Sequence, residues 1–347
     1  MFYGKRNIGL AVTALAVALA GAPTAKANEK LVVVKGGTGL QYSMLIIAEK
    51  GGFFKQQGLD LDVEDLQSGP RQVAALMGGS ADISVSGMVQ VVKAHAQGND
   101  QLVAVTSFQS GMDLTLVLSD QATKKTGITT DMPLDEKVKR LKGIRIGITS
   151  PGGSTDVFIR SLLKKRGVDP DTAIQILPLG GGNEMLAALQ KGATDGFVWG
   201  APQAQIAEDK HLGSIAINAA DVPELKGMPY QGLVATRDEI KSKPELYRKL
   251  AVAIGNAIKF AKANEAKSKQ YVESEFPNVK KLVFDAAWPA YYRLIPDSVL
   301  ITPGQVKITA DWLNITRKEP LKVNYTDIVY PTFAKAADKQ VLDKNGD

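Results

Sequence analysis

Short apolar runs alternate with longer segments of helical periodicity along most of the chain. The runs with the composition of buried strands are Leu31–Val34, Leu59–Val63, Ile83–Val85, Leu102–Thr106, Ile144–Ile148, Ile174–Leu179, Gly196–Trp199, Gly213–Asn218 and Leu233–Thr236. Helical segments such as Ser43 to Lys50 and Thr155 to Arg166 separate them. Strands that alternate regularly with helices predict a mainly parallel sheet covered on both faces.

Two stretches of the chain repeat one pattern at a fixed offset. Residues 74–87 read AALMGGSADISVSG and residues 187–200 read AALQKGATDGFVWG, with seven identical positions. The same offset pairs Gly69 with Gly182, and it pairs the strand at Leu31 with the strand at Ile144. A repeat of this length predicts two α/β lobes of like design. Because ligands in open α/β sheets sit beyond the carboxyl ends of the strands, we expect the functional site in the cleft between the lobes.

The boundaries of the lobes follow from shifts in composition. We expect residues 28–118 to form the first part of lobe 1, residues 119–225 to form lobe 2, and residues 226–347 to return to lobe 1. Ser119 to Lys142 has few apolar positions, which is typical of a surface connection. The sequence Ser242-Lys243-Pro244-Glu245 predicts a capping box at the start of a long helix that ends near Asn264. Further helices are expected near Lys281–Tyr292 and Pro303–Leu313.

The start of the chain, up to Ala27, has the pattern of an export signal. Lys5 and Arg6 precede the apolar run from Ile8 to Ala20, and Ala25-Lys26-Ala27 fits the rule of small residues at a cleavage site. The apolar run is shorter than the roughly 20 residues that a membrane span needs. We therefore expect cleavage after Ala27 and a periplasmic location.

Composition excludes several kinds of site. The chain has no cysteine, which rules out thiolate metal sites, cysteine nucleophiles and disulfides. Its two histidines, His95 and His211, are far apart in the sequence, so a histidine metal site or catalytic triad is not expected. Asp60, Asp62 and Glu64 alternate along a predicted strand, which is typical of a solvated edge strand rather than a metal site. The formal charge of +6 is not gathered into a basic patch with aromatic residues, so no nucleic-acid partner is expected. We expect a binding protein without metal, cofactor or catalytic residues.

The turns that follow the strands carry small and polar residues. Gly36 to Gln41, Ser84 to Gly87 and Ser150 to Thr155 all follow predicted strands. Glycine lets a ligand approach the backbone, helix starts favour a negative group, and hydroxyls add donors. Any one of these turns, taken alone, could simply cap the helix that follows it. Several turns at one cleft favour ligand contact.

Larger side chains near the strand ends leave two roles open. Trp199 ends the repeated strand of lobe 2, where it would either stack on a ligand or belong to the core. The same alternatives hold for Phe108 and Gln109 after the strand that ends at Thr106. Asn183 opens a helix, either as a cap or as a ligand contact.

Three motifs together carry a resemblance to a known family. Ala48 to Asp60, which reads AEKGGFFKQQGLD, resembles the EKGFF..EGL segment of the nitrate/sulfonate/taurine-type substrate-binding proteins of ABC importers. Ala75 to Asp82 resembles their AL..G.AD segment, and Leu141 to Gly143 resembles the LKG that leads into their second lobe. The likeness covers nearly the whole chain after Ala27, in the same order.

The resemblance implies a type II periplasmic binding protein, with two mainly parallel α/β lobes joined by hinge strands and closing over one small molecule. It also implies delivery to a membrane permease driven by a cytoplasmic ATPase. With the candidates named above, the expected ligand contacts are Thr38, Gly39, Gln41, Tyr42, Ser86, Gly87, Met88, Phe108, Gln109, Gly152, Gly153, Ser154, Thr155, Asn183 and Trp199. We expect a monomer.

The aromatic residues near the predicted strand ends bear on the class of ligand. Trp199, Phe108 and Tyr42 favour an organic ligand with an anionic head and an apolar or aromatic body, such as a sulfonate or a carboxylate. One alternative is a periplasmic sensor module. Another is a protein of the thiamin-related branch of this superfamily, which binds or makes a pyrimidine precursor. The enzyme of that branch would require a cysteine-rich segment and an active-site histidine, and the chain has no cysteine.

Overall fold

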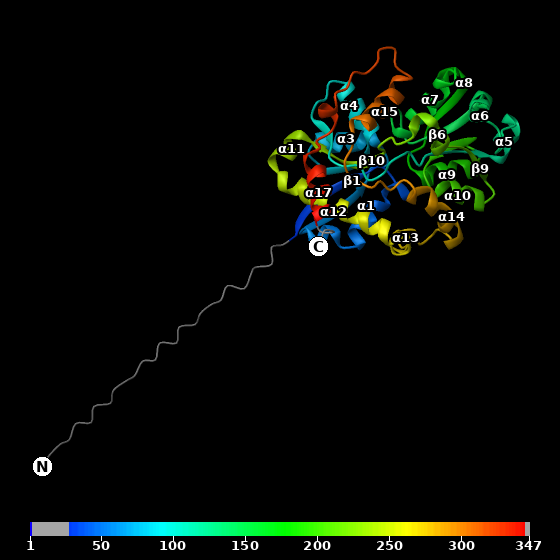
Figure 1. Cartoon of the computed structure of the whole chain (residues 1–347). Coiled ribbons are helices and arrows are strands. Elements are labelled where there is room, and N and C mark those ends of the chain that lie inside the picture. The colour runs from blue at the N-terminus through cyan, green and yellow to red at the C-terminus, as the bar shows by residue number, and fades with distance from the viewer. Residues whose placement is uncertain (2–27, 344–347) are drawn as a thin grey trace.

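The computed structural model describes residue 1 and residues 28–343, so the expected export signal lies outside the described residues. Figure 1 shows two α/β bodies side by side, one around β1 and β10 and the other around β6 and β9. Within the described part of the chain, no helix is both long and apolar enough to cross a membrane.

The first sheet has the strand order β2-β1-β3-β10-β4. Its strands are β1 (Glu29–Lys35), β2 (Leu59–Asp65), β3 (Ile83–Gly87), β4 (Leu102–Ala104) and β10 (Gln231–Thr236). Strand β1 pairs in parallel with β2 and β3, whereas β10 runs antiparallel to β3 and β4. The sheet is therefore mainly parallel, as expected for lobe 1.

The second sheet repeats this plan with the order β7-β6-β8-β5-β9. Its strands are β5 (Thr115–Ser119), β6 (Ile144–Ile148), β7 (Ile174–Pro178), β8 (Gly196–Trp199) and β9 (Gly213–Asn218). Strand β6 is parallel to β7 and β8, and β5 is antiparallel to β8 and β9. Two lobes of the same design confirm the fold that the internal repeat predicts.

The antiparallel strand of each sheet is the one that arrives from the other lobe. Strand β5 follows β4 of lobe 1 but lies in the second sheet, so the chain crosses before Thr115 rather than at residue 118 as we expected. Composition does not reveal this boundary, because membership of a sheet depends on pairing. The two crossings also pair with each other, since the Tyr230 N–H donates to the Gln109 carbonyl at 2.9 Å. They form the hinge between the lobes.

The segment from Ser119 to Lys142 is not an unstructured connection. It contains α5 (Asp120–Thr126) and α6 (Leu134–Arg140), which bury Ala122 and Val138. One buried apolar residue in each short helix is enough to fix it against lobe 2, and this sparse signal is the reason that the sequence did not predict either helix.

The C-terminal helices follow the predicted periodicity. Helix α12 (Pro244–Ala263) packs against α1 (Ser43–Lys50) and α17 (Thr332–Asp343). The capping box predicted at Ser242 does not form, because Ser242 ends α11 (Arg237–Ser242) and its hydroxyl donates to the Glu239 carbonyl. Helices α14 (Lys281–Tyr292) and α15 (Pro303–Asn314) lie where they were expected.

The repeated aspartate has a structural role in both lobes. Asp82 Oδ2 accepts a hydrogen bond of 2.9 Å from the Val32 N–H, and Asp195 Oδ2 accepts one of 2.8 Å from the Arg145 N–H. Val32 and Arg145 are themselves related by the offset of the repeat. Asp82 therefore connects the turn before β3 to β1, and Asp195 connects the turn before β8 to β6.

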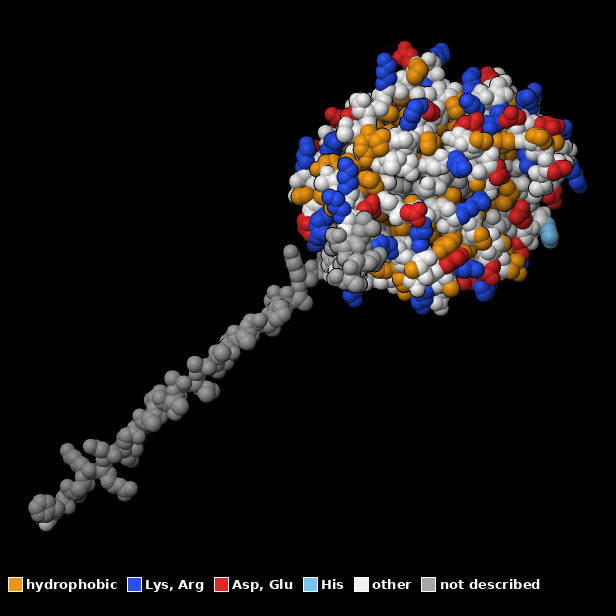
Figure 2. Space-filling model, viewed as in Figure 1, with side chains coloured by type: hydrophobic (Ala, Val, Ile, Leu, Met, Phe, Trp, Pro, Cys, Tyr) orange, Lys and Arg blue, Asp and Glu red, His pale blue; other side chains and the backbone are white. Residues whose placement is uncertain are grey.

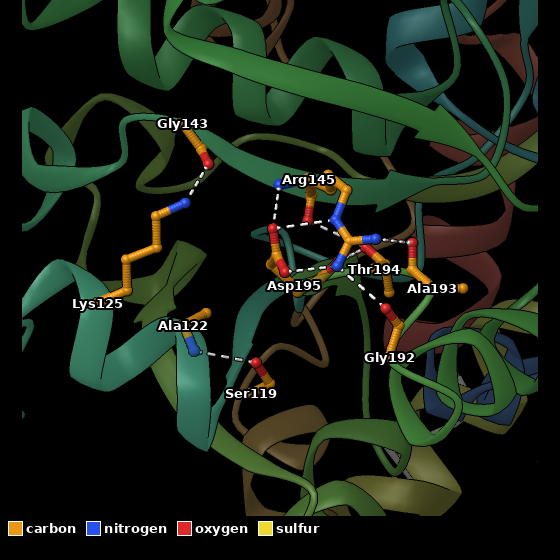
Figure 3. Close-up of polar contacts among 10 residues, drawn as sticks. Ser119, Ala122, Lys125, Gly143, Arg145, Gly192, Ala193, Thr194 and Asp195 are labelled. Atoms are coloured by element: carbon orange, nitrogen blue, oxygen red, sulfur yellow. Dashed lines mark hydrogen bonds and ion pairs between the residues drawn. The ribbon is translucent and has the colours of Figure 1, made fainter.

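Lobe 2 reinforces this tie with an ion pair (Figure 3). The Arg145 guanidinium contacts Asp195 Oδ1 at 2.8 Å and also donates to the carbonyls of Gly192 and Ala193, both at 3.0 Å. The guanidinium holds the pKa of the Asp195 carboxyl below its ordinary value. The stabilisation is therefore present at neutral pH and is lost as the pH falls through that lowered pKa.

Removing this carboxylate is expected to weaken the fold. Asp195→Ala should lower the free energy of unfolding by about 2–3 kcal/mol, because it removes hydrogen bonds to a charged group and leaves a partly buried backbone N–H without a partner. Asp195→Asn keeps an acceptor for the Arg145 N–H and should lose less. Urea denaturation at pH 7 measures both variants. Equal losses from the two variants would contradict the role of the charge.

Candidate functional site

A small cavity of about 30 Å³ lies between the lobes. Its lining residues are Gly36, Gln41, Tyr42, Gly69, Gln72, Ser86, Gly87, Gln90, Thr149, Ser154, Thr155, Trp199, Tyr230 and Gln231. They come from both sheets and from the second crossing. The volume is room for roughly two water molecules, so the lobes are close together and a larger ligand requires them to separate.

Three helices begin at the cavity wall. They are α3 (Gly69–Met77), α4 (Met88–Ala96) and α7 (Ser154–Lys165). None of the three has a side-chain hydrogen bond capping its first turn. The first N–H groups of a helix have no partner within the helix, and they make its start the positive end of the helix dipole. Three such ends at one cavity favour a negatively charged group there.

The side chains at the cavity are polar and uncharged. The lining residues within the described chain include no lysine, arginine, histidine or carboxylate. Ser86 Oγ, Gln41 Oε1 and Gln231 Oε1 are buried and have no hydrogen-bond partner. A buried polar atom without a partner costs free energy, so these atoms are free to bind a ligand or water.

Two tyrosines supply further hydroxyl groups. The Tyr42 hydroxyl accepts a hydrogen bond of 3.1 Å from the Gly36 N–H. Burial raises the pKa of Tyr42 and of Tyr230 above the ordinary value. Both phenols are therefore neutral at physiological pH, and each keeps a proton that it can donate.

Trp199 joins the lobes at one side of the cavity. Its indole Nε1–H donates to the Thr38 carbonyl of lobe 1 at 3.2 Å. Its ring lies so close to Gly37 that a Cβ at that glycine would be 2.6 Å from the ring. Next to it, the Leu40 N–H donates to the Ala201 carbonyl at 2.8 Å. Trp199 thus lines the cavity and also holds the lobes together.

A second group of contacts joins the lobes on the side of α7. The Lys93 ammonium group of lobe 1 donates to the Gly152 carbonyl, and the Ser68 and Ser150 hydroxyls are 3.1 Å apart. Burial lowers the pKa of Lys93, and nearby Asp156 offsets part of that change. These contacts hold the turn just before α7 against lobe 1. The position of the α7 start therefore depends on whether the lobes are closed.

Seven of the fifteen residues expected from the sequence line the cavity. They are Gln41, Tyr42, Ser86, Gly87, Ser154, Thr155 and Trp199. Their contact with a ligand stays a prediction. The others are absent from the lining: Thr38, Gly39, Met88, Phe108, Gln109, Gly152, Gly153 and Asn183.

The residues outside the lining have other surroundings. The Phe108 side chain is fully buried in the core of lobe 1, and Met88 is buried in a second apolar cluster. Gln109 is fully buried in the hinge, where its amide donates to the Gly111 carbonyl. Thr38 and Gly152 offer their carbonyls to the other lobe, as described above. Asn183 accepts a long hydrogen bond of 3.5 Å from Gln203 within lobe 2.

Six of the fourteen lining residues were not expected from the sequence. Gly36 lies in one of the expected turns, and the missed residues are Gly69, Gln72, Gln90, Thr149, Tyr230 and Gln231. Because β10 is antiparallel to β3, the start of β10 faces the cavity, whereas the contacts expected from the sequence lie at the ends of parallel strands. Gln90 lies in the first turn of α4 behind the strand exit. Thr149 directly follows β6, and its position could have been found from the strand end alone.

The fold is that of a two-lobed binding protein, with a cavity between its lobes next to the hinge. The chain belongs to the NMT1-like family, whose model matches residues 37–273. The resemblance inferred from the three sequence motifs is thereby confirmed.

Relatives of the chain include binding proteins and an enzyme. The chain is 23% identical over 290 residues to the putative binding protein YtlA of Bacillus subtilis, covering 82% of this chain and 83% of the relative. It is 26% identical over 288 residues to the 4-amino-5-hydroxymethyl-2-methylpyrimidine phosphate synthase THI12 of Saccharomyces cerevisiae, with coverages of 78% and 76%.

A solved structure shows the same fold. The alkanesulfonate-binding protein SsuA from Xanthomonas axonopodis pv. citri, bound to MOPS, superposes with a TM-score of 0.68 at 18% identity. The match covers 88% of this chain and 99% of SsuA.

The aromatic wall of the cavity can be tested directly. Trp199→Ala should weaken ligand binding at least tenfold, because it removes the ring at the cavity and the hydrogen bond to the Thr38 carbonyl. Trp199→Phe keeps a ring and removes only the hydrogen bond, so its loss should be smaller. Calorimetric titration measures both, with thermal unfolding as the check that each variant is folded. Unchanged affinity in the alanine variant would contradict the role of the ring.

Proposed function

We propose that this protein is the substrate-binding component of an ABC importer. It captures a small organic anion, of the sulfonate or carboxylate type, between its lobes and delivers it to a membrane permease. The export pattern at residues 1–27 supports a periplasmic location. We further propose that it acts as a monomer and is not an enzyme.

One observation carries the proposal of an anion, namely the three helix starts at the cavity. Each start contributes up to about 2 kcal/mol to binding of a negative group in a partly buried site. Hydrogen bonds from the hydroxyls and backbone N–H groups to that group contribute about 1.5–3 kcal/mol each. Such a site holds an anion without a basic side chain, which agrees with the uncharged lining.

The size of the cavity limits what is bound in the closed form. About 30 Å³ suits the anionic head of a ligand rather than a large aromatic body. A longer body would enter only with the lobes further apart, through movement at the hinge around Gln109 and Tyr230.

The face of the molecule shown in Figure 2 gives no support to a nucleic-acid partner. Figure 2 shows basic and acidic side chains interspersed over the face in view, without an extended basic patch.

The similarity to a pyrimidine phosphate synthase keeps a second candidate function open. A binding protein for a pyrimidine precursor would use the same cleft, and the chain is 26% identical to that synthase. The chain has no cysteine, and the described residues that line the cavity include no histidine, so catalysis of that reaction has little support.

Thermal unfolding of the purified protein against a panel of compounds tests the proposal. The panel contains sulfonates, carboxylates, nitrate and pyrimidines. A ligand at about a hundred times its dissociation constant adds roughly 2.7 kcal/mol to the free energy of unfolding. Stabilisation by organic anions supports the proposal. Stabilisation by uncharged pyrimidines alone would contradict it, and native mass spectrometry shows whether a ligand was retained during purification.

A further inference from the structure

One buried amide oxygen at the cavity has no donor. Gln41 lines the cavity between the lobes and is only 2% exposed. Its Oε1 atom has no hydrogen-bond partner. A Cβ would lie 2.2 Å from this oxygen if it were added to Gly39, and 3.1 Å from it if it were added to Gly200. Gln41 Oε1 therefore lies between a loop of lobe 1 and the exit of β8 in lobe 2.

The other end of the same amide group has a partner. Burial raises the pKa of Tyr42, and a hydrogen bond from the Gln41 side chain offsets part of that rise. A group that lowers the pKa of a phenol donates to its oxygen, so the Gln41 N–H group faces Tyr42. This orientation leaves Oε1 as the free acceptor of the amide.

The nearby Asp113 carboxyl does not supply the missing donor. Asp113 lies on the first crossing, just before β5, and a Cβ added to Gly200 would be 2.8 Å from its Oδ2. It is buried and does not line the cavity. Burial raises its pKa from 3.8 to about 6, so at neutral pH it is ionised and its oxygens can only accept. Gln41 Oε1 therefore stays an acceptor without a donor at physiological pH.

A second amide oxygen at the cavity has different surroundings. Gln231 Oε1 and Ser86 Oγ also lack partners, but these two residues line a further cavity of about 10 Å³ as well. A cavity of that size holds one water molecule, which can donate to both oxygens. Gln41 does not line this further cavity, so the donor for its oxygen has to come from the ligand cavity itself.

We propose that Gln41 Oε1 selects a cargo with a hydroxyl group next to its anionic group, and that this cargo is a small 2-hydroxy carboxylate. The helix starts of α3, α4 and α7 hold the carboxylate, and the hydroxyl group donates its proton to Gln41. This inference rests on the proposed function of the same cavity.

Charge and size both favour a hydroxyl group as the donor. The described residues that line the cavity include no carboxylate, so a protonated amine would lose its hydration without contacting an opposite charge. A hydroxyl group is neutral and about as large as a water molecule. The cavity of about 30 Å³ has room for roughly two groups of that size, which suits a hydroxyl beside one end of a carboxylate. A ligand without a donor there would leave Gln41 Oε1 buried and unpaired, which costs free energy.

Calorimetric titration of matched acids tests the inference. One set is glycolate, acetate and glycine, and the other set is lactate, propanoate and alanine. Within each set, only the group on the carbon next to the carboxylate differs. The hydroxy acid of at least one set should bind to the wild-type protein at least tenfold more tightly than both other members of its set.

Variants of three glutamines assign the effect to one atom. In Gln41→Met the preference for the hydroxy acid should fall towards one, because methionine has a similar length and no amide oxygen. Gln203→Met is the matched control, since Gln203 is also 2% exposed with an unpaired Oε1 but does not line the cavity. It should keep the preference, and so should Gln231→Met. Thermal unfolding shows which variants are folded, and Gln41→Asn, which shortens the side chain, replaces Gln41→Met if that variant is not.

Other outcomes overturn the inference. Equal or tighter binding of the unsubstituted acids would remove the role of the hydroxyl group and leave the proposed anion site intact. Tighter binding of the amino acids would show that the donor is charged. A preference that persists in the Gln41 variant, or that is lost in Gln231→Met instead, would show that another residue recognises the hydroxyl group. Binding of none of the six acids would also overturn the inference, whereas the proposed function is decided by the wider panel above.

Discussion

Ser154→Asp is expected to weaken binding of an anionic ligand at least a hundredfold. Ser154 is the first residue of α7 and lines the cavity. A carboxylate there would be close to the bound anion, and two unit charges about 4 Å apart repel by about 4 kcal/mol at the effective dielectric constant of partly buried protein sites. Since about 1.4 kcal/mol corresponds to a tenfold change in affinity, a hundredfold loss remains even after substantial screening.

The same substitution separates binding from folding. A negative charge at a helix start stabilises the helix, so the Ser154→Asp variant should unfold no more easily than the wild-type protein. Ser154→Asn has the same size without the charge and should lose much less affinity. Calorimetric titration with an anion identified in the panel measures both. Similar losses in the two variants would mean that size, not charge, is decisive, and would contradict an anion at the start of α7.

Asp113→Asn is expected to raise the free energy of unfolding of the ligand-free protein at pH 7.5. The gain at this pH should exceed the gain at low pH by about 3 kcal/mol. Burial raises the pKa of Asp113 from its ordinary 3.8 to about 6, and the nearby Gln109 amide offsets part of the rise. The folded protein therefore binds this proton more tightly than the unfolded chain. The resulting stabilisation is fully present below pH 3.8 and is lost as the pH rises through about 6.

The asparagine variant has no proton to lose, so it avoids this loss. Denaturant unfolding of both proteins between pH 3.5 and 8 should therefore give curves that coincide at low pH and diverge between about pH 4 and 6. A difference between the two proteins that does not change with pH would contradict an uncompensated carboxylate at this position.

The sequence predicted most of the fold because two signals in it are strong. All of the predicted apolar runs form strands, and the internal repeat places equivalent strands at equivalent positions of the two sheets. It missed β5, since the residues Thr115 to Ser119 lie next to a boundary in composition and pair with strands that are distant in the sequence.

The site was only partly predictable for a different reason. Residues directly at strand exits, such as Ser86 and Ser154, were found because the end of a strand fixes their place. Gln231 and Tyr230 escaped because the direction of β10 is known only once it pairs with β3. Phe108 was expected at the site but is in the core, because a strand exit fixes where the backbone goes and not where the side chain points.

The most direct test of the account compares an anion with its uncharged analogue. The organic anion that gives the largest stabilisation in the panel is titrated calorimetrically into the wild-type protein, and so is the corresponding amide or sulfonamide of the same shape. We expect the anion to bind at least a hundredfold more tightly, because only the anion interacts strongly with the three helix starts. Equal affinities for the two compounds would contradict the central claim that this cavity is an anion site.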